Sequence, residues 1–284
     1  MSSRTPDSAC QPVTSARFPD SPLVRCDIEG AVATVWLNRP DKHNGLNGDM
    51  FAELVAVAAR LRRNRHVRVV ILAGMGDSFC AGLDFRAVQS DRWLIPKLFL
   101  KWPWQRDNLA QRLTMCWRRL PVPVIAVLHG NCLGGGLQLA LAADFRLAAR
   151  SSRLALMEIR WGLVPDMGAL VTLSRLVRED VARELAMTGR VVDADEALQL
   201  GLVTRVCADP LHDARELAAQ LAAQSPDAVV AAKAMFNRGW TSAEWWALWR
   251  ERWTQLRLLG RYNQQLAVRK GLGKDDAETP FRDR

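Results

Sequence analysis

A short apolar run that leads into a glycine-rich loop constrains this chain more than any other feature. Residues 122–128 are apolar and largely β-branched, as is typical of a strand buried on both faces. Four glycines follow within residues 130–136, and the pattern from Leu137 is helical. Such a loop leaves backbone N–H groups unpaired at the positive end of a helix dipole, where they can bind an anionic oxygen. Close packing of a strand against a helix would need the same glycines, so both interpretations stay open at this point.

A second glycine-bearing loop lies earlier in the chain. Residues 67–72 are predicted to form another buried strand, and the sequence SFCAGLD follows at 78–84. In a right-handed winding of strand and helix, equivalent loops from successive turns lie side by side at one edge of the sheet. One N–H group from each loop would then reach a single oxygen, which predicts an oxyanion hole built from two distant stretches.

Composition excludes several classes of protein. The 284 residues, 49% of them hydrophobic, can bury a substantial core. No apolar run is long enough to span a membrane and the N-terminus lacks an apolar signal core, so we expect a cytoplasmic protein without a membrane span. The six cysteines lack paired or metal-ligand spacing, which predicts reduced thiols, no disulfide and no metal. The net charge of +9 is interleaved with acids and indicates a solvated basic surface rather than a nucleic-acid partner.

The N-terminal part of the chain is predicted to form a tail, a hairpin and a helix. The first twenty residues, rich in Ser, Pro and Asp, are expected to be disordered, with order beginning near Leu23. Alternating polar and apolar residues over 24–37 predict a β-hairpin, and residues 48–63 a helix. The turn-rich loop between them carries Arg39 and Lys42. It is either a phosphate-binding loop or an ordinary solvated connection.

Four segments, in order, resemble the successive signatures of the crotonase (enoyl-CoA hydratase/isomerase) superfamily. They are SFCAGLD at 78–84, HGNCLGGGLQLALAADFRLAA at 129–149, MEIRWGLVPDMGAL at 157–170 and TGRVVDADEALQLGLVTRV at 188–206. The resemblance runs from about Leu23 to Arg269. It implies an α/β fold in which a spiral of ββα turns, residues 21–205, precedes a helical C-terminal segment, residues 206–284, that packs on a neighbouring subunit in a homotrimer or dimer of trimers.

The resemblance also implies an acyl-CoA ligand and the residues that bind it. The family stabilises a thioester enolate with two backbone N–H groups, which by motif position are those of Leu83 and Gly135. Coenzyme A is part of the substrate, so no separate cofactor is expected, and the glycines do not spell a dinucleotide or P-loop motif. The implied contacts to CoA are Arg39, Lys42, Ala81, Gly82 and Lys274.

Family members place acid/base carboxylates at positions that correspond here to Gln138, Glu158 and Asp166. Gln138 departs from the hydratase pattern, and because an amide cannot accept a proton at neutral pH, the two-carboxylate arrangement that activates water is incomplete. Glu158 keeps the family's glutamate. Asp166 resembles the second acid of dienoyl-CoA isomerases or the nucleophile of the dehalogenase branch, but it is also compatible with a helix N-cap. The dehalogenase alternative ranks lowest, since no histidine lies between His129 and His212.

Two tryptophan-rich stretches have structural and functional interpretations. Between Arg86 and Arg119 the resemblance fades, and aromatic residues there either line the acyl chain or pack in a core or interface. Pro96 and Pro103 argue against one uninterrupted helix in that stretch. Beyond residue 193 the chain is predicted to be helical apart from a strand at 202–206, and tryptophans at 240, 245, 246, 249 and 253 are expected to pack against core or subunit.

The sequence therefore predicts an acyl-CoA enzyme of fatty acid metabolism that moves a double bond by proton shuttling. One glutamate, helped by Asp166, suffices for isomerisation, whereas Gln138 weakens the case for hydration. Enoyl-CoA hydratase is the alternative. A third hypothesis, a CoA-binding or RNA-binding homologue with weakened catalysis, rests on Gln138 and the basic charge, and the oxyanion glycines argue against it.

Overall fold

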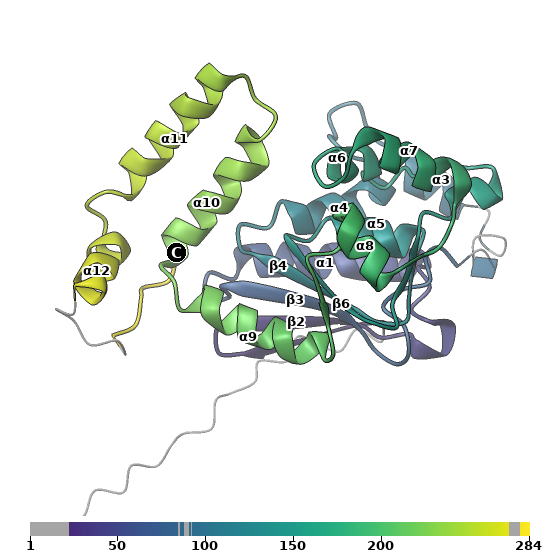
Figure 1. Ribbon diagram of the computed structural model, residues 1–284, viewed down its shortest axis with the longest axis horizontal. Coiled ribbons are helices and arrows are strands. Elements are labelled where there is room, and N and C mark those ends of the chain that lie inside the picture. The colour runs from purple at the N-terminus through teal and green to yellow at the C-terminus, as the bar shows by residue number, and fades with distance from the viewer. Residues whose placement is uncertain (1–22, 85, 88–90, 92, 273–278) are drawn as a thin grey trace, which may run out of the picture.

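The computed structural model describes residues 23–84, 86–87, 91, 93–272 and 279–284, and it has an α/β fold with a mainly parallel sheet at its centre (Figure 1). The predicted tail, residues 1–20, and the predicted CoA contact Lys274 lie outside the described residues. In the part of the chain that is described, no helix is both long and apolar enough to cross a membrane.

The central sheet has six strands in the order β1-β2-β3-β4-β6-β9. The first two form the predicted antiparallel hairpin, and every later pair is parallel. Parallel neighbours require crossovers, so the chain leaves and re-enters the sheet after each of these strands. The strands are β1 (Val24–Glu29), β2 (Val32–Leu37), β3 (Val69–Gly74), β4 (Val124–Leu128), β6 (Phe145–Ala149) and β9 (Arg205–Cys207).

A smaller sheet of three short strands lies beside the larger one. Its order is β5-β7-β8, with β5 parallel to β7 and β7 antiparallel to β8. The strands are β5 (Asn131–Leu133), β7 (Arg153–Ala155) and β8 (Val192–Asp193). Because β5 lies inside the glycine-rich loop of residues 130–136, this small sheet fixes the position of the loop just before Gly134.

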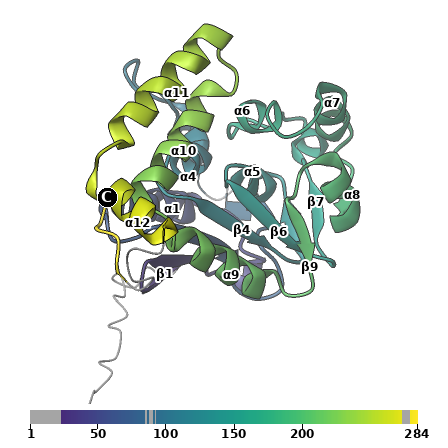
Figure 2. The ribbon, with the colours of Figure 1, turned by 60° about the vertical axis from the view of Figure 1, so that its left-hand side comes forward.

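Helices cover both faces of the large sheet (Figures 1 and 2). The described helices and 3₁₀ turns are η1 (Pro40–Lys42), α1 (Gly48–Arg63), α3 (Leu94–Phe99), α4 (Leu109–Arg118), α5 (Gly135–Leu141), η2 (Glu158–Trp161), α6 (Ala169–Leu173), α7 (Glu179–Thr188), α8 (Ala194–Leu200), α9 (Pro210–Ala222), α10 (Pro226–Gly239), α11 (Glu244–Leu258) and α12 (Tyr262–Gly271). Helix α1 has the predicted bounds because the Asn47 side chain caps it, accepting a hydrogen bond from Met50 N at 2.9 Å.

The two faces of the central strands pack into two separate cores. In β3, Val70 and Leu72 face the larger core with α1, α4 and α5, whereas Val69 and Ile71 face α9. Every residue of β3 and β4 is buried, as predicted for strands covered on both sides. The predicted strands are confirmed with small shifts: 67–72 lies at 69–74, and 202–206 at 205–207.

The predicted domain boundary between residues 205 and 206 falls inside β9. The next helix, α9, packs against β3, β4 and β6 and thus completes the second core. The change to a separate helical segment comes after α9. Helices α10, α11 and α12, here called the C-terminal arm, extend beside the core (Figures 1 and 2).

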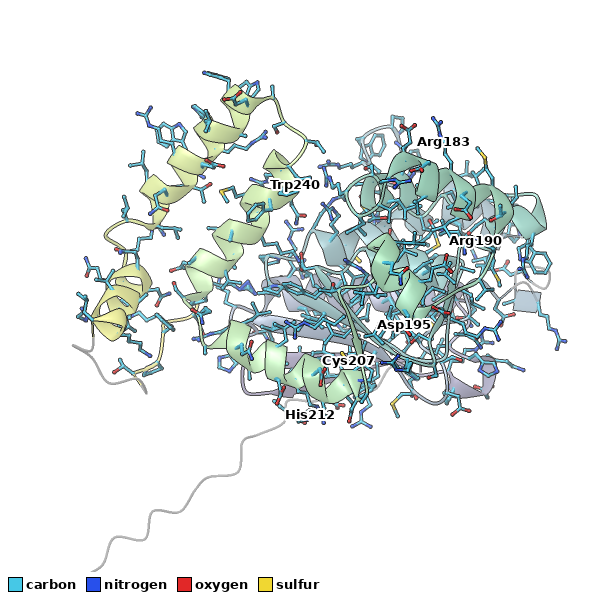
Figure 3. All side chains as sticks on the ribbon, viewed as in Figure 1. Arg183, Arg190, Asp195, Cys207, His212 and Trp240 are labelled. Carbon is cyan, nitrogen blue, oxygen red and sulfur yellow. The ribbon has the colours of Figure 1, made fainter. Side chains whose placement is uncertain are left out.

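The tryptophans fall into two environments. Trp117 on α4 is fully buried, whereas Trp102 and Trp104 are exposed and stack on each other with ring centroids 5.1 Å apart. The segment from 86 to 119 contains two helices, α3 and α4, so the prediction that it is not one uninterrupted helix is confirmed. Pro103 lies between the two helices, whereas Pro96 lies in the first turn of α3, where proline is tolerated. In the arm, the core alternative is wrong, because all five tryptophans from 240 to 253 are at least 44% exposed; Figure 3 marks Trp240 at the end of α10.

Candidate active site

The two glycine-bearing loops lie against each other, joined by strand-like hydrogen bonds. Cys80 N donates to Asn131 O at 3.0 Å, and Leu133 N donates to Cys80 O at 3.0 Å. A β-carbon added to Gly82 would lie 3.4 Å from Gly135 N and 2.7 Å from Leu133 O. The structure therefore brings the 78–84 loop and the start of α5 together, although some fifty residues separate them in sequence.

The N–H groups of Leu83 and Gly135 are available to a ligand. Leu46 pairs with the residues on either side of Leu83: Leu46 N donates to Gly82 O at 2.7 Å, and Asp84 N donates to Leu46 O at 2.9 Å. In such a bridge the N–H of the middle residue points the other way. Gly135 is the first residue of α5, where the helix supplies no acceptor. Within the described residues, neither group donates to a protein acceptor.

The glycines pack the two loops closely together and also form left-handed turns. Gly136 packs against the other loop so closely that an added β-carbon would lie 2.4 Å from Cys80 O. Gly82 and Gly134 have φ values of +89° and +51°, a region that side-chain-bearing residues avoid. Close packing by Gly136 and the left-handed turns at Gly82 and Gly134 hold the two N–H groups near one point.

Gln138 is buried and both ends of its amide are used. It is 1% exposed, its Nε2 donates to Glu158 Oε1 at 2.7 Å, and its Oε1 accepts from Met167 N at 2.8 Å. These two bonds fix which end of the amide carries the NH₂ group, since Met167 N can only donate. Gln138 thus links the glutamate on η2 to the backbone just before α6.

Glu158 lies over the glycine loop with one free carboxylate oxygen. An added β-carbon on Gly134 would be 3.4 Å from Glu158 Oε1. The carboxylate therefore lies beside Gly134, the residue just before the Gly135 N–H. Its Oε2 is buried, and among the described residues nothing donates a hydrogen bond to it. Burial raises the pKa of Glu158, and the negative charge of Asp166 raises it further, although the Gln138 hydrogen bond opposes the shift. Such a carboxylate is suited to accept a proton.

Asp166 is a second titratable group at the site. Burial raises its pKa, and its charge in turn acts on Glu158. The helix-cap alternative for Asp166 is wrong: α6 begins at Ala169, its N-cap is Gly168 at φ +87°, and no side chain caps it. Asp166 therefore does not cap a helix, although a Pro-Asp pair before a helix suggested that it would.

The combined arrangement can bind an anionic oxygen at two backbone N–H groups and move protons with two carboxylates beside it. This is the set of parts that enolate chemistry needs. In the described part of the chain, no cluster of three or more potential ligands offers a metal site.

Comparison with known proteins agrees with the geometry. The family described as enoyl-CoA hydratase/isomerase matches residues 27–282. The chain belongs to this family. It is 36% identical over 225 residues to the mitochondrial Delta(3,5)-Delta(2,4)-dienoyl-CoA isomerase of Homo sapiens, covering 75% of this chain and 68% of that protein. It is 35% identical over 214 residues to the short-chain-enoyl-CoA hydratase of Clostridium acetobutylicum, covering 74% and 79%.

Solved structures place the fold in the crotonase superfamily. An enoyl-CoA hydratase from Mycobacterium smegmatis superposes with a TM-score of 0.81 at 31% identity, covering 93% of this chain and 99% of that one. An enoyl-CoA hydratase from Bacillus anthracis gives a TM-score of 0.82 at 29% identity, covering 92% and 99%. The predicted α/β crotonase fold is thereby confirmed.

In this member of the enoyl-CoA hydratase/isomerase family, the Arg39 side chain is bound to Asp84 and to the backbone of Gly45. Its Nη1 lies 2.7 Å from Asp84 Oδ2 and 2.9 Å from Gly45 O, and only 18% of its side chain is exposed. Burial acts to raise the pKa of Asp84, but the hydrogen bond and charge of Arg39, together with backbone hydrogen bonds from Ala87 and Arg86, outweigh it and lower that pKa. Arg39 thus anchors the loop that carries Leu83, a role the sequence did not indicate.

The other predicted CoA contacts that the structure describes belong to the 38–46 and 78–84 loops. Lys42 is exposed at the end of η1, Ala81 is half-buried and donates its N–H to His43 O at 2.9 Å, and Gly82 is buried. Lys42 is therefore the exposed cation of the 38–46 loop. Whether CoA occupies these positions remains a prediction from the family resemblance.

Asn44 was missed by the sequence analysis, although it organises the site. It is fully buried at φ +55°, and its Nδ2 donates to Met75 O at 2.9 Å and to Ser78 O at 2.8 Å. These bonds tie the 38–46 loop to the 78–84 loop. The available signal was the Asn44-Gly45 pair, since asparagine tolerates a left-handed conformation better than most residues.

Proposed function

We propose that this protein isomerises enoyl-CoA or dienoyl-CoA thioesters by moving a proton along the acyl chain. The family makes an acyl-CoA the substrate class. The choice of isomerisation within the family rests on one observation: Gln138, which occupies a position where a second carboxylate would activate water, is locked between Glu158 and Met167 N. An amide held in this way positions Glu158 but accepts no proton.

In the proposed mechanism, the thioester oxygen accepts hydrogen bonds from Leu83 N and Gly135 N. Negative charge develops on this oxygen when a proton leaves the α or γ carbon, and donors already fixed in place stabilise it without reorganisation. Glu158 Oε2 takes the proton, the electrons of the broken C–H bond enter the conjugated enolate, and the double bond shifts. Return of a proton at the other end of the conjugated system completes the isomerisation.

Asp166 is proposed to assist when the conjugated system is long. A single carboxylate reaches carbons that are close together, whereas a dienoyl chain exchanges protons at carbons further apart. With Glu158 at one end and Asp166 at the other, one group accepts while the other donates. The similarity to a human dienoyl-CoA isomerase supports this assignment, and the raised pKa values of both carboxyl groups favour proton exchange near neutral pH.

The test is a substrate panel in deuterated water, with 3-enoyl-CoA, 3,5-dienoyl-CoA and 2-enoyl-CoA thioesters followed by NMR and mass spectrometry. We expect deuterium at the α carbon and conjugated products from the first two substrates, with slow addition of water to the third. Rapid hydration of 2-enoyl-CoA without double-bond movement would assign the protein as a hydratase. Binding of all three without exchange would favour the weakened homologue.

We also propose that the C-terminal arm mediates assembly into trimers or pairs of trimers. The four exposed tryptophans of α11 support this, because aromatic residues are enriched at protein interfaces. Native mass spectrometry of the 31.8 kDa chain should show trimers or hexamers, and Trp249→Arg with Trp253→Arg should shift them towards monomers. A wild-type protein that stays monomeric at micromolar concentration would contradict the proposal.

A further inference from the structure

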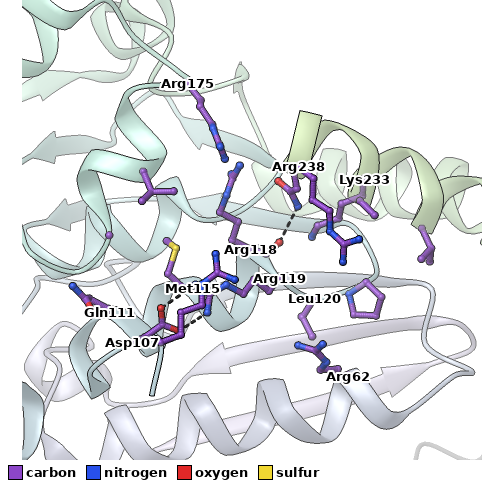
Figure 4. A pocket seen from close by; sticks show the side chains of 17 residues that line it. Arg62, Asp107, Gln111, Met115, Arg118, Arg119, Leu120, Arg175, Lys233 and Arg238 are labelled. Carbon is purple, nitrogen blue, oxygen red and sulfur yellow. Dashed lines mark hydrogen bonds and ion pairs between the residues drawn. The ribbon is translucent and has the colours of Figure 1, made fainter. Parts of the chain in front are cut away.

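A cavity separate from the residues assigned above to proton transfer lies where the C-terminal arm meets the core. It has a volume of about 790 Å³ and is walled by α4, the segment around α6, and α10 (Figure 4). This volume is in the range of small-molecule sites. We call it the basic cavity, because seven of its lining residues are Arg or Lys and one, Asp107, is acidic.

Two of the seven cations are neutralised within the protein. Arg119 forms a two-pronged ion pair with Asp107, one of whose bonds measures 2.9 Å. Lys233 Nζ lies 2.6 Å from Asp144 Oδ2 and donates to Val122 O at 2.8 Å, and its side chain is 6% exposed. These pairs occupy Asp107, the one acidic residue that lines the cavity, and Asp144. They also fix the walls, since the Lys233 bonds tie α10 to the start of β4.

The remaining five cations, Arg62, Arg106, Arg118, Arg175 and Arg238, have no carboxylate partner among the described residues. Arg118 and Arg175 matter most, since both are half-buried and their guanidinium groups approach each other in the cavity (Figure 4). Burial lowers the pKa of Arg118, and the charge of Arg175 lowers it further, while the charge of Asp144, which is paired with Lys233, opposes the shift. Like charges brought together at a partly buried site destabilise the folded protein when no anion is bound between them.

A hydrogen bond from an uncharged residue of α10 holds the backbone of Arg118 in place. Its backbone carbonyl accepts a hydrogen bond from Asn237 Nδ2 of α10 at 3.1 Å, while α10 is itself held by Lys233. Arg175 follows α6, where its Nη2 contacts Thr241 Oγ1 at 3.4 Å. Three elements therefore hold guanidinium groups around one space. Planar guanidinium forks bind carboxylates and phosphates with paired hydrogen bonds.

We propose that the basic cavity binds a small molecule that carries two or more carboxylate or phosphate groups. Such a ligand supplies the negative charge that the lining residues lack and satisfies guanidinium donors that the protein leaves unpaired. A neutral or singly charged ligand would leave most of the repulsion between Arg118 and Arg175 in place. The cavity is thus selective for multiply charged oxyanions.

The anion has two sources compatible with this chemistry. Gly168 and Met115 line the basic cavity, and Gly168 adjoins Met167, whose N–H binds Gln138, so the cavity lies behind the candidate active site. The anion is either a free small molecule or the far end of an acyl group that carries its own carboxylate. The second source rests on the proposed function. The first is independent of it.

The decisive variant is Arg118→Met with Arg175→Met, and the matched control is Arg252→Met on α11, an exposed residue outside the cavity. Calorimetry and thermal unfolding with citrate and with pyrophosphate would be run on the full chain. We expect wild type and control to bind, and the double variant to bind roughly tenfold or more weakly. Without ligand, the double variant should melt at or above the wild-type temperature because a like-charge contact has been removed.

The proposal is overturned if wild type binds neither anion at low ionic strength, or if the double variant binds as tightly as the control. It is also overturned if the double variant loses only self-association, since the cavity would then be a subunit contact. A thioester of a dicarboxylic acid that competes with citrate would assign the anion to the acyl end, and citrate binding without competition would assign it to a free ligand. Because citrate binding requires no turnover, failure here is distinguishable from failure of the isomerase proposal.

Discussion

The side-chain amide of Gln138 donates a hydrogen bond of 2.7 Å to Oε1 of Glu158, while Oε2 of the same carboxylate is buried without a donor among the described residues. One oxygen is therefore held and the other is free. The hydrogen-bonded oxygen, Oε1, lies 3.4 Å from the position of a β-carbon added to Gly134. The free oxygen is the one we assign to proton transfer, because a buried acceptor without a partner binds a proton more readily than a solvated one.

Replacement of Glu158 by Gln should abolish proton transfer and leave binding intact. Glutamine has the same size and can still accept the hydrogen bond from Gln138, but it carries no proton at neutral pH. Isomerisation and α-proton exchange should fall by roughly 100-fold to 10,000-fold. The measurement is exchange in deuterated water, with acyl-CoA binding followed through the rise in melting temperature.

The control for that variant is Glu184→Gln on α7, an exposed carboxylate that pairs with Arg190 on the surface. It should leave exchange unchanged. A folded Glu158→Gln protein that binds acyl-CoA and still exchanges α protons at the wild-type rate would remove Glu158 from the mechanism.

The Glu158→Gln variant should also be more stable than wild type, and the difference in stability should grow as the pH rises. The folded-state pKa of Glu158 lies above its ordinary value of 4.5, so the folded protein holds this proton more tightly than the unfolded chain. As the pH rises through that raised pKa, ionisation destabilises the fold, whereas glutamine is unaffected. The difference in melting temperature between Glu158→Gln and wild type should be small at about pH 4 and positive at about pH 8. A difference that shrinks as the pH rises would contradict the assigned shift.

Substitution of Gln138 by Glu should introduce hydratase activity. It places a second carboxylate beside Glu158, where the two can share a proton and orient water, while an oxygen remains to accept from Met167 N. Hydration of a short 2-enoyl-CoA, measured by loss of the conjugated thioester absorbance, should rise roughly tenfold or more. Gln138→Ala, which lacks any acid, should show no such gain. A wild-type rate already near 10 to 1000 per second, the usual range for enzymes, would count against the isomerase proposal.

Much of the fold followed from local pattern. Apolar runs predicted the buried strands β3 and β4, and alternation predicted the hairpin. Helix α1 was also predicted, and the structure adds the Asn47 cap that fixes its start. The limits of β9 and the packing of α9 could not be predicted in this way. Helix α9 is positioned by its contact with the second face of the sheet, which is a tertiary contact that the local sequence pattern does not reveal.

For the site, the resemblance to the family motifs identified Leu83, Gly135, Gln138 and Glu158, and the structure brings them together. What spacing could not give was the pairing of polar groups. Arg39 is held by Asp84, forty-five residues away, and the Pro-Asp pattern at Asp166 resembled a cap for a helix that in fact begins after Gly168. Both depend on contacts between distant segments.

Replacement of Asp166 by Asn should separate the roles of the two carboxylates. Because Asp166 does not cap α6, the variant should keep the wild-type melting temperature or exceed it, since removal of a buried carboxylate with a raised pKa relieves desolvation. Isomerisation of 3,5-dienoyl-CoA should fall by roughly 100-fold or more, with a smaller effect on 3-enoyl-CoA. Equal losses on both substrates would mean that Asp166 takes part in proton transfer for 3-enoyl-CoA as well as for 3,5-dienoyl-CoA. No loss on either substrate would exclude Asp166 from proton transfer.

Insertion of a methyl group at Gly82 should damage the oxyanion site more than the fold. Alanine there would strain the backbone at φ +89° and bring its β-carbon 2.7 Å from Leu133 O, so the loop must shift and carry the Leu83 N–H with it. The matched control is Gly30→Ala at φ +57°, where nothing lies within 4 Å of the added carbon. Both variants should lose roughly 1 kcal/mol or more of stability from the left-handed backbone. Only Gly82→Ala should lose activity, by about 100-fold to 1000-fold in kcat, the effect of removing one oxyanion donor. If Gly82→Ala turns over at the rate of Gly30→Ala, the Leu83 N–H is not a donor to the thioester oxygen.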